Sequence, residues 1–349
     1  MKTVLKSITL AVAFLLTNVN LFASETEAKG GAEEEKFNAV EVIMHHISDS
    51  HEFHILDYTN AKGEEVPVSI PLPVILFTDG NLDIFMSSEF NHGHADVVRG
   101  DRTYHIEHDH ITELGGAHPL DFSITKNVFS MLLSVIMLIL IFTAVGRSYR
   151  KGSGAPKGLA SFMEPLVLFV RDDIAVPNIG EKKANKFLPY LLTVFFFILM
   201  NNLLGLIPFF PGSANLTGNI SFTITLAFIT FLITNLNGNK DYWKHIFATP
   251  GVPLWLAPIM IPVELMGIFA KPVALLIRLF ANITAGHIII LSLISLIFIF
   301  KTIMIAPVSV GFVLFMNVLE LLVAALQAYI FTLLSALFIG MAVAEHEHH

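Results

Sequence analysis

A single arginine, Arg278, stands deep inside a long apolar run. It belongs to the segment Glu264–His287, which reads ELMGIFAKPVALLIRLFANITAGH and continues as apolar sequence to Phe300. Arginine cannot lose its charge by releasing a proton, and a fixed charge at membrane depth costs about 3 kcal/mol on insertion scales. Arg278 therefore faces water or a partner, or it snorkels to a membrane surface. Because it lies about twenty residues from either end of the run, we favour a functional charge.

The polar residues around Arg278 follow helical spacing. Glu264, Lys271 and Arg278 are seven residues apart, so on a helix that turns 100° per residue they share one face. Asn282 stays close to that face, whereas His287, nine residues past Arg278, points to the opposite side. The helix is predicted to present a fixed charge in one direction and a titratable group in another.

A second apolar run, 306–343, follows the first run, 253–300, after a break at Lys301–Pro307. Each run is near forty residues long, although about twenty suffice to cross a bilayer. Each run is therefore either two spans or one long, tilted helix. Because no polar turn interrupts either run, we expect two tilted helices that form a hairpin.

Two polar residues of the second run, Glu320 and Gln327, are also seven apart. In an antiparallel hairpin that turns near residue 303, residues equally far from the turn lie at equal depth, which pairs His287 with Glu320. The same register pairs Arg278 with Gln327. A His–Glu pair at membrane depth suits proton relay, because both groups titrate and their coupling keeps one pKa near physiological pH. The alternative is a buried pair that only fixes helix packing.

The overall composition predicts a membrane protein. Of the 349 residues, 54% are hydrophobic and only 14% are charged, with a mean hydropathy of +0.67. These values exclude an ordinary soluble domain and predict several spans. The sequence has no Cys, so disulfides and thiolate metal sites are excluded. The net charge of −8 says little about function, because the charges are segregated along the chain.

The N-terminal part is predicted to lie outside the cytoplasm. In residues 1–24, Lys2 and Lys6 precede a short apolar core that ends in small residues, as in a cleaved secretory signal; an uncleaved anchor is the alternative. Residues 25–123 are acidic and rich in His. Residues 25–36 are predicted to be disordered, and a small, partly β module is expected after them.

Four runs in this module have β character, and Asp79-Gly80 between two of them indicates a hairpin turn. The runs are His51–Tyr58, Val66–Phe77, Leu82–Met86 and Arg102–Ile106.

Ten of the fifteen His residues lie in the same module. The pairs His92/His94 and His108/His110 could hold a transition metal. No zinc-type spacing supplies a third and fourth ligand. We therefore favour a solvated, pH-responsive surface and expect no metal site.

The remaining part, 124–349, is predicted to be an all-α membrane domain. Three spans at 128–145, 187–207 and 220–236 precede the tilted hairpin. The basic loop between the first two spans is expected in the cytoplasm by the positive-inside rule. Within that loop, residues 159–170 form an amphipathic patch that is expected to lie along the membrane surface. The alternation of loops places the C-terminus inside.

Three segments of this domain resemble subunit a of the F-type ATP synthase, the membrane stator of its proton channel. They are KPVALLIRLFANITAGH (271–287), LQAYIF (326–331) and MNNLLGLIP (200–208). The resemblance extends from about residue 125 to 345, and RLFAN together with LQA is specific for the family. It implies a non-catalytic subunit without a cofactor, consistent with the lack of a GxxxxGK[ST] phosphate loop.

The resemblance also implies partners: the ring of c subunits, the b subunits of the peripheral stalk, transported protons and the lipid bilayer of a bacterial inner membrane. No nucleic acid is implied. Arg278 would be the essential charge that faces the rotor, favours the ionised c-subunit carboxylate and blocks leakage between two offset half-channels. Glu264 would mark the cytoplasmic exit. The other polar positions would line the external half-channel: Asn202, Asn282, His287, Glu320 and Gln327.

Two departures from the family pattern are visible. In many bacterial members the acid and the His stand at exchanged positions relative to His287 and Glu320. Gly205 stands where some members carry an acidic residue, so the entry path is expected to differ here.

Two other classes of protein stay open on sequence alone. A self-contained ion-coupled transporter would show repeated halves and broken helices, and no such repeat is evident. The third class is a metal-binding envelope protein with membrane anchors. The titratable pair His287 and Glu320 favours protons as the transported ion, although the chemistry of the partner ring decides between protons and sodium.

Overall fold

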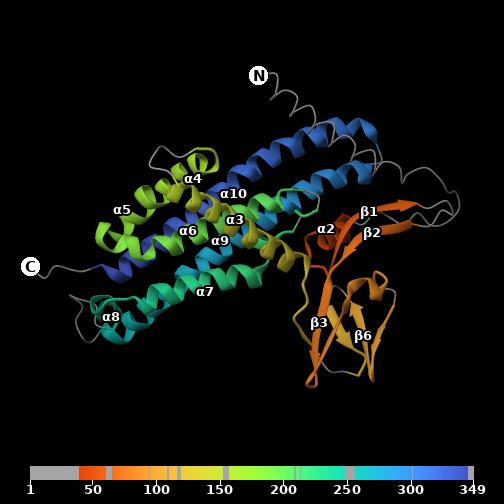
Figure 1. Cartoon of the computed structure of the whole chain (residues 1–349), viewed down its shortest axis with the longest axis horizontal. Coiled ribbons are helices and arrows are strands. Elements are labelled where there is room, and N and C mark those ends of the chain that lie inside the picture. The colour runs from red at the N-terminus through yellow and green to blue at the C-terminus, as the bar shows by residue number, and fades with distance from the viewer. Residues whose placement is uncertain are drawn as a thin grey trace, which may run out of the picture. The chain divides into compact units, whose positions relative to one another are not determined.

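The computed structural model describes residues 39–59, 65–93, 95–107, 110–115, 119–151, 157–207, 210–212, 214–247, 256–300 and 302–344. The predicted signal and the acidic segment after it lie outside these residues. Strands occupy the first part of the described chain, and long helices occupy the rest (Figure 1).

The strands form three small antiparallel sheets. The helix α2 (Ala39–Ile47) precedes the pair β1 (Glu52–Thr59) and β2 (Glu65–Pro71). The second sheet has the order β4-β3-β8, from β3 (Pro73–Thr78), β4 (Asn81–Met86) and β8 (Leu120–Asp121). The third has the order β5-β6-β7, from β5 (Val97–Arg99), β6 (Arg102–Glu107) and β7 (His110–Glu113).

The predicted hairpin turn at Asp79-Gly80 is confirmed. Thr78 pairs with Asn81 at the ends of β3 and β4, and the two turn residues have φ of 49° and 82°. Positive φ at both central positions is the geometry of a type I′ turn, whose twist matches that of the flanking strands. Asp and Gly tolerate this conformation better than other residues do.

The prediction of one continuous β run over Val66–Phe77 was wrong. The chain leaves one sheet after Pro71 and enters another at Pro73. Both prolines lack a backbone N–H, so neither can continue a ladder through the middle of a sheet. Leu72 between them is buried, and its N–H donates to the Ser87 hydroxyl at 3.0 Å.

The helices of the C-terminal part are long and apolar. They begin with α3 (Lys126–Lys151), α4 (Leu159–Leu168), the π-helical η3 (Phe169–Ala175) and α5 (Val176–Ile179). They continue with α6 (Glu181–Gly205), the short η4 (Leu216–Gly218), α7 (Ile220–Leu236) and α8 (Lys240–Phe247). The last two are α9 (Ala257–Phe300) and α10 (Ala306–Val343), with η6 (Ile303–Ile305) between them.

Among the described residues, four helices are long and apolar enough to cross a membrane: α3, α6, α9 and α10. The helix α7 reaches that length only together with α8, from which it is bent by 101°. These helices are consistent with the expected multi-span membrane protein. The predicted runs 220–236 and 306–343 coincide with α7 and α10, whereas α3 and α6 begin earlier than predicted.

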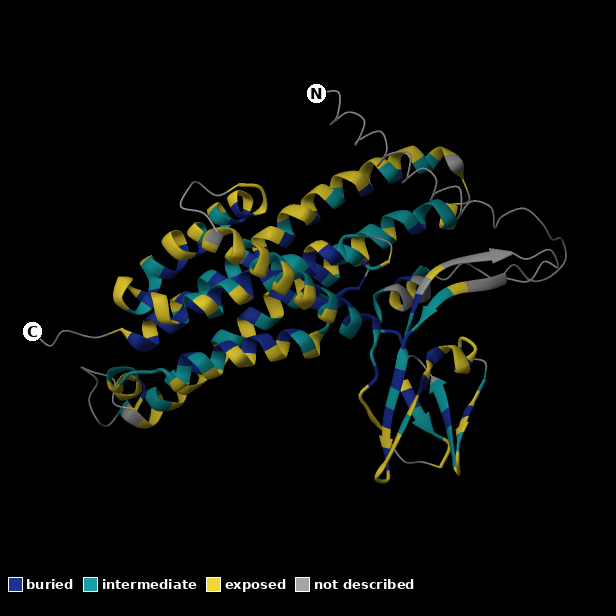
Figure 2. Ribbon diagram, in the orientation of Figure 1, coloured by how far each residue is buried: buried dark blue, intermediate teal, exposed yellow. Residues whose placement is uncertain are grey.

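The core of the helical part is built around α6. Leu191, Phe195 and Ile198 of α6 are buried in one cluster with Leu275 of α9 and Phe331 of α10. Half of the most apolar window of α6 is buried, compared with 11% for α9 and 22% for α10. Figure 2 accordingly shows many exposed residues along the last two helices. Apolar surface on this scale implies lipid or protein partners.

The strands are tied to the start of α3 by hydrogen bonds. Asp49 accepts from the N–H of Asn127 at 3.1 Å and from the Thr125 hydroxyl at 3.0 Å. A carboxylate at this position satisfies free N–H groups of the first helical turn and complements the positive end of the helix dipole. The Lys126 N–H donates to the Ser50 carbonyl at 3.0 Å.

A buried histidine joins β8 to the start of β1. The Nε2 of His51, which is 4% exposed, lies 3.1 Å from Asp121 Oδ2, and the Ser123 N–H donates to Asp121 Oδ1 at 2.8 Å. Burial by itself raises the pKa of Asp121, but the hydrogen bonds from His51 and Ser123 outweigh burial and hold the pKa below its usual value.

This contact predicts acid sensitivity of the β region. A carboxyl whose pKa is lower in the folded state stabilises the fold above its unfolded pKa, and that stability is lost as the pH falls through the folded pKa. We expect Asp121→Asn to raise amide exchange in β3 and β8 at pH 7 and to reduce the difference between pH 7 and pH 3. Hydrogen exchange, corrected for intrinsic rates, measures both effects. The exposed Asp101→Asn is the control, and equal protection in the two variants would contradict the prediction.

Candidate functional site

The two long helices α9 and α10 bring His287 and Glu320 together. The distance between His287 Nδ1 and Glu320 Oε1 is 2.8 Å. This is the pairing that the antiparallel register predicts. Toward the inter-helix turn, the Ser309 hydroxyl of α10 donates to the Leu293 carbonyl of α9, so the two helices keep the same register along this stretch.

The His287–Glu320 pair is sequestered from solvent. The Glu320 side chain is 5% exposed and the His287 side chain 17% exposed. The two atoms meet at ion-pair distance but without hydrogen-bond alignment, so Glu320 Oε1 has no aligned donor among the described residues. A buried carboxylate is costly when it is charged and unpaired.

One glycine, Gly286, makes room for this pair, and a second, Gly205, lies beside it. A Cβ atom at Gly286 would lie 2.8 Å from Glu320 Oε1, and a Cβ at Gly205 would lie 3.9 Å from His287 Nε2. Glu320 therefore lies over a helix surface that only glycine leaves free. Sequence reasoning noted Gly205 as a departure from the family but missed Gly286. The position of Gly286, directly before His287 in the sequence, is the feature that could have identified it.

Arg278 lies on a different side of α9 from this pair. Its residue is exposed, and among the described residues no ion pair or hydrogen bond reaches its guanidinium. The neighbouring positions on its face carry small, exposed side chains: Ala274, Ala281 and Ala285. The predicted opposition between a fixed charge and a titratable group on one helix is thus present.

Gln327 is buried, at 3% exposed, and no hydrogen bond joins it to Arg278 in the described structure. The two residues still lie at similar depth. Arg278 is nine residues from His287, about 14 Å along a helix, and Gln327 is seven residues from Glu320, about 10 Å. The similar depth predicted for Arg278 and Gln327 is consistent with this register. A hydrogen bond between the two side chains is not observed in the described structure.

Asn202 fixes helix packing near the pair. Its side-chain amide donates to the Ala324 carbonyl at 3.0 Å, and its oxygen accepts from the Thr217 hydroxyl at 2.7 Å. The adjacent Asn201 is also buried, and its Oδ1 lacks a hydrogen-bond partner among the described residues. Asn282, by contrast, is exposed on α9.

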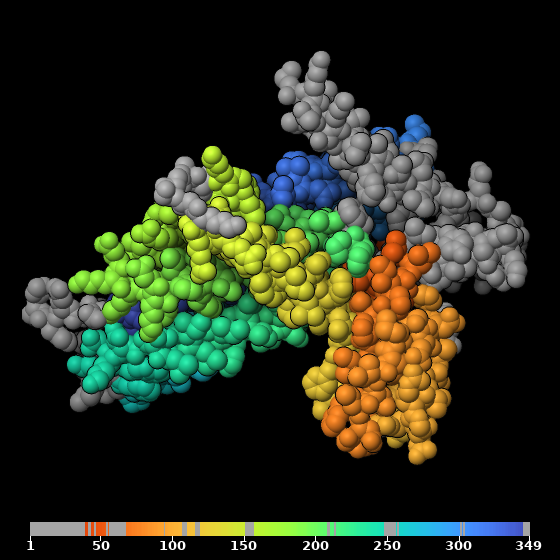
Figure 3. Space-filling view, viewed as in Figure 1, coloured from red at the N-terminus to blue at the C-terminus, as the bar shows by residue number. Residues whose placement is uncertain are grey.

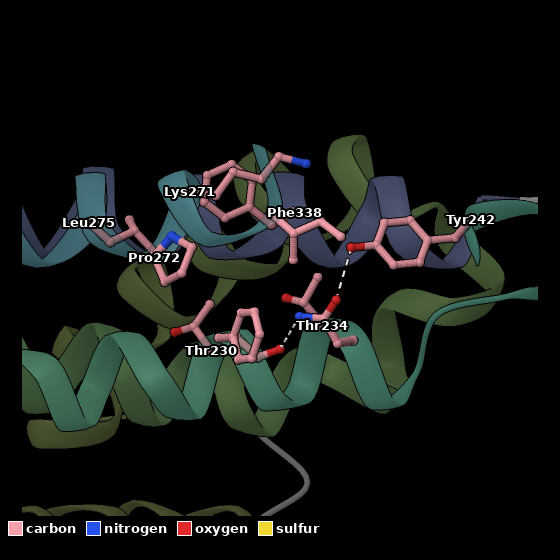
Figure 4. Close-up of a pocket in the computed structure, with 10 residues that line it drawn as sticks. Thr230, Thr234, Tyr242, Lys271, Pro272, Leu275 and Phe338 are labelled. Atoms are coloured by element: carbon pink, nitrogen blue, oxygen red, sulfur yellow. Dashed lines mark hydrogen bonds between the residues drawn. The ribbon is translucent and has the colours of Figure 1, made fainter. Parts of the chain in front are cut away.

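A small cavity with a mostly apolar lining lies near Lys271, between α7, α8, α9 and α10 (Figure 4). Lys271 is partly buried on the face of α9 that also carries Glu264, and its amine lies 5.7 Å from the centre of the Phe338 ring. The Tyr242 hydroxyl donates to Asn235 at 3.0 Å. Thr234 Oγ1 is buried in the cavity wall without a described partner. The cavity has room for about one water molecule.

Three histidines of the β region, His51, His92 and His105, are paired with carboxylates in the described structure. His92 Nδ1 lies 2.9 Å from Glu52, and His105 Nδ1 lies 2.7 Å from Asp96. Within the described part of the chain, no group of three potential ligands could hold a metal ion. Of the two candidate metal pairs, His94 and His108 lie outside the described residues.

Comparison with known proteins places the helical part in a family. Residues 128–340 match the family described as ATP synthase A chain. ATP synthase subunit a of Chloroherpeton thalassium is 53% identical over 243 residues, which cover 68% of this chain and 70% of that protein. The subunit of Chlorobium phaeobacteroides (strain DSM 266) is 41% identical over 99% of this chain and 94% of its own length. Residues 42–128 match a second family, described as a domain of unknown function.

The chain therefore belongs to the ATP synthase A chain family. It is an integral membrane subunit of that complex and does not itself carry out catalysis. The two other classes considered from the sequence, a self-contained transporter and a metal-binding envelope protein, are replaced by this assignment.

The glycine beside the pair yields a test. We expect Gly286→Ala to displace the Glu320 carboxylate from His287, because the added Cβ would lie 2.8 Å from Oε1. Loss of one good charge contact is worth about a factor of ten in rate, so ATP-driven proton uptake into inverted vesicles should fall by about that factor. The matched control is Gly267→Ala on the same helix, where a Cβ meets nothing within 4 Å. Equal pumping by the two variants would show that the contact is dispensable.

Proposed function

We propose that this chain is the proton-translocating stator subunit of an F-type ATP synthase, with two offset half-channels that load and unload protons on a rotating c-ring. One observation carries the proposal: α9 presents Arg278, which has no partner among the described residues, on an open face, and His287, paired with Glu320 of α10, on another. A fixed charge on one face of a helix and a titratable pair at another fit a pathway in which protons must leave the protein to pass the arginine.

Arg278 acts as the barrier and as the partner of the rotor carboxylate. Its charge persists at every physiological pH, so it repels protons and favours the ionised form of an approaching carboxylate. The small side chains beside it, Ala274 and Ala281, allow close approach of partner helices. The low burial of α9 and α10 supports such a partner on this side.

The external half-channel runs past His287 and Glu320. His287 Nε2 is directed toward Gly205 at the end of α6, which leaves a passage without an acidic side chain at that position. Asn202 and Gln327 line the buried side of this path, and Asn282 lines the exposed side near Arg278. A proton handed from His287 to Glu320 then reaches the rotor at the depth of the arginine.

The inner half-channel leaves past Glu264. Lys271 lies between Glu264 and Arg278 on the same helix and interacts electrostatically with the Glu264 carboxylate. Glu264 is only partly buried, so it can exchange protons with water. The small cavity beside Lys271, which Thr234, Asn235 and Tyr242 also line, has room for about one water molecule on this side of the helix bundle.

The setting of this mechanism is a bacterial inner membrane. One charge that crosses 100 mV releases about 2.3 kcal/mol, so several protons are needed per ATP and a multi-site ring is the partner. The b subunits of the peripheral stalk hold the stator against rotation. The β region lies outside the cytoplasm, and the C-terminus lies inside.

The charge of Arg278 is the first target. We expect Arg278→Ala to abolish ATP-driven acidification of inverted vesicles while the complex still assembles, because no group remains to ionise the rotor carboxylate. Passive proton leak through vesicles stripped of the catalytic sector should rise as the barrier is removed. Removal of an exposed cation elsewhere, Lys244→Ala, is the control. Pumping at the wild-type level by the Arg278 variant would refute the proposal.

An exchange of the two titratable groups tests the relay. We expect His287→Glu and Glu320→His each to reduce proton flux by about tenfold or more, because each single change leaves two like groups side by side. The double variant restores the pair and should recover most of the flux. The variant with His287→Leu and Glu320→Leu should lose it. Failure of the double exchange to exceed the single variants would mean that the pair serves only packing.

A further inference from the structure

The sheet β4-β3-β8 has an outer face that is apolar and exposed. Strands place alternate residues on opposite faces, and the outward positions of this sheet carry large hydrophobic side chains. Each is between 39% and 64% exposed: Phe77, Leu82, Ile84, Met86, Leu120 and Phe122. In Figure 3 the strands of this region, in orange, are not covered by the described helices in that view.

These side chains form one continuous patch. Phe77 pairs with Leu82 on one neighbouring strand and with Leu120 on the other. Ile75 pairs with Ile84 one step further along the ladder. Cross-strand neighbours have Cβ atoms about 5 Å apart, so the exposed residues touch. A contiguous apolar patch of this kind marks a protein-binding or membrane-binding surface.

The opposite, inner face of the sheet carries the hydrophobic core of the β region, so the outer patch is a second apolar surface. Val74 and Leu76 of β3 are fully buried on that face, with Phe85 and Tyr104. The strand β3 is thus apolar on both sides, which is typical of strands covered on both faces. The described part of the chain covers only one of them.

The edge strand β8 and the residues after it leave large apolar side chains uncovered. Leu120 and Phe122 lie on the outer face and are 59% and 64% exposed. On the opposite face, Asp121 is also exposed and bonds to His51, whereas Ser123 is buried and its hydroxyl accepts from the Ile75 N–H. The sequence of this segment is therefore matched to an apolar environment outside the sheet.

The patch is continuous with a membrane span. The backbone pairing with β3 extends beyond β8, because the Phe122 N–H donates to the Ile75 carbonyl at 2.9 Å and the Ile124 N–H donates to the Pro73 carbonyl at 3.0 Å. The helix α3 begins two residues later at Lys126.

The short connection limits how far the patch can lie from the lipid. Four residues span at most about 13 Å, and the polar layer of one leaflet is about 5 to 8 Å thick. The helix α3 itself exposes Ile136, Ile139 and Leu140 along its length. Phe122 therefore lies within reach of the interfacial layer that surrounds α3.

We propose that the outer face of β4-β3-β8 rests on the bilayer surface, with its apolar side chains in the interfacial layer of the leaflet where α3 begins. The six side chains include no charge and no hydrogen-bonding group, which favours lipid over the polar-rimmed surface of a protein partner. Such contact fixes the β region at the bilayer surface, beside the helical domain. The proposal rests on the span α3 and not on the proton pathway.

The absence of cysteine from the chain allows a direct test. Single variants Leu82→Cys and Ile84→Cys, in the full chain within the assembled complex, are spin-labelled and reconstituted into phosphatidylcholine vesicles. Accessibility to molecular oxygen is then compared with accessibility to a water-soluble nickel chelate. The matched control is Val98→Cys. Val98 lies on β5, in the sheet β5-β6-β7, and is 59% exposed.

We expect the oxygen-to-nickel ratio at both test positions to exceed that at Val98 several-fold. A ratio equal to that of Val98 would place the face in water and overturn the proposal. Low accessibility to both reagents, with an immobilised label, would also overturn it, because a protein surface or a second copy of the chain would then cover the patch. Both test positions are exposed, so the labels do not disturb the core and the result is interpretable.

Discussion

The structure depends on the cost of placing charged groups inside an apolar hairpin. The helices α9 and α10 carry few polar residues along some eighty positions. Their ionisable side chains are accommodated in two different ways. Glu320 is buried and lies 2.8 Å from a titratable partner in the same chain, His287. Arg278 has no partner among the described residues and is exposed, so its charge is open to the surroundings of the helix.

This division explains why the helical part is packed unevenly. The core lies around α6, which packs against α3 and α10 and shares its apolar cluster with Leu275 of α9. The helix α9 is the least buried of the four long helices, and α10 is also far less buried than α6. Under the proposed function, one side of the subunit must be rigid and the other side available to a moving partner, and this distribution of burial fits that requirement.

The β region adds a second surface that needs a partner. Its core is small, and it is attached to α3 by hydrogen bonds that Asp49 and Ser50 accept from N–H groups at the start of the helix. The aromatic rings of Phe53, Phe129 and Phe210 meet at centroid distances of 5.4 to 5.7 Å. These contacts join β1, α3 and the segment that follows α6, close to Gly205. The strands are thus anchored at the rim of the helical domain.

The sequence by itself determined the membrane class, the long apolar helices, the turn at Asp79-Gly80 and the register of the hairpin. These features are encoded locally: hydropathy sets helix length, Gly and Asp set the turn, and a seven-residue spacing sets the face of a helix. Pairing His287 with Glu320 was predictable because an antiparallel hairpin leaves one free parameter, the position of its turn.

Only the tertiary structure decided the features that depend on packing between distant segments. Gly286 was missed because its role, leaving space for Glu320, appears only when α10 lies against α9. The run Val66–Phe77 is divided between two sheets because Pro71 and Pro73 lack the N–H needed to continue a ladder, and which strands pair there depends on distant segments. The strand β8 has only two residues and therefore shows no alternating pattern in the sequence. The apolar outer face of β4-β3-β8 could not be distinguished from core by sequence, since a buried and an exposed hydrophobic strand read alike until the neighbours of each face are known.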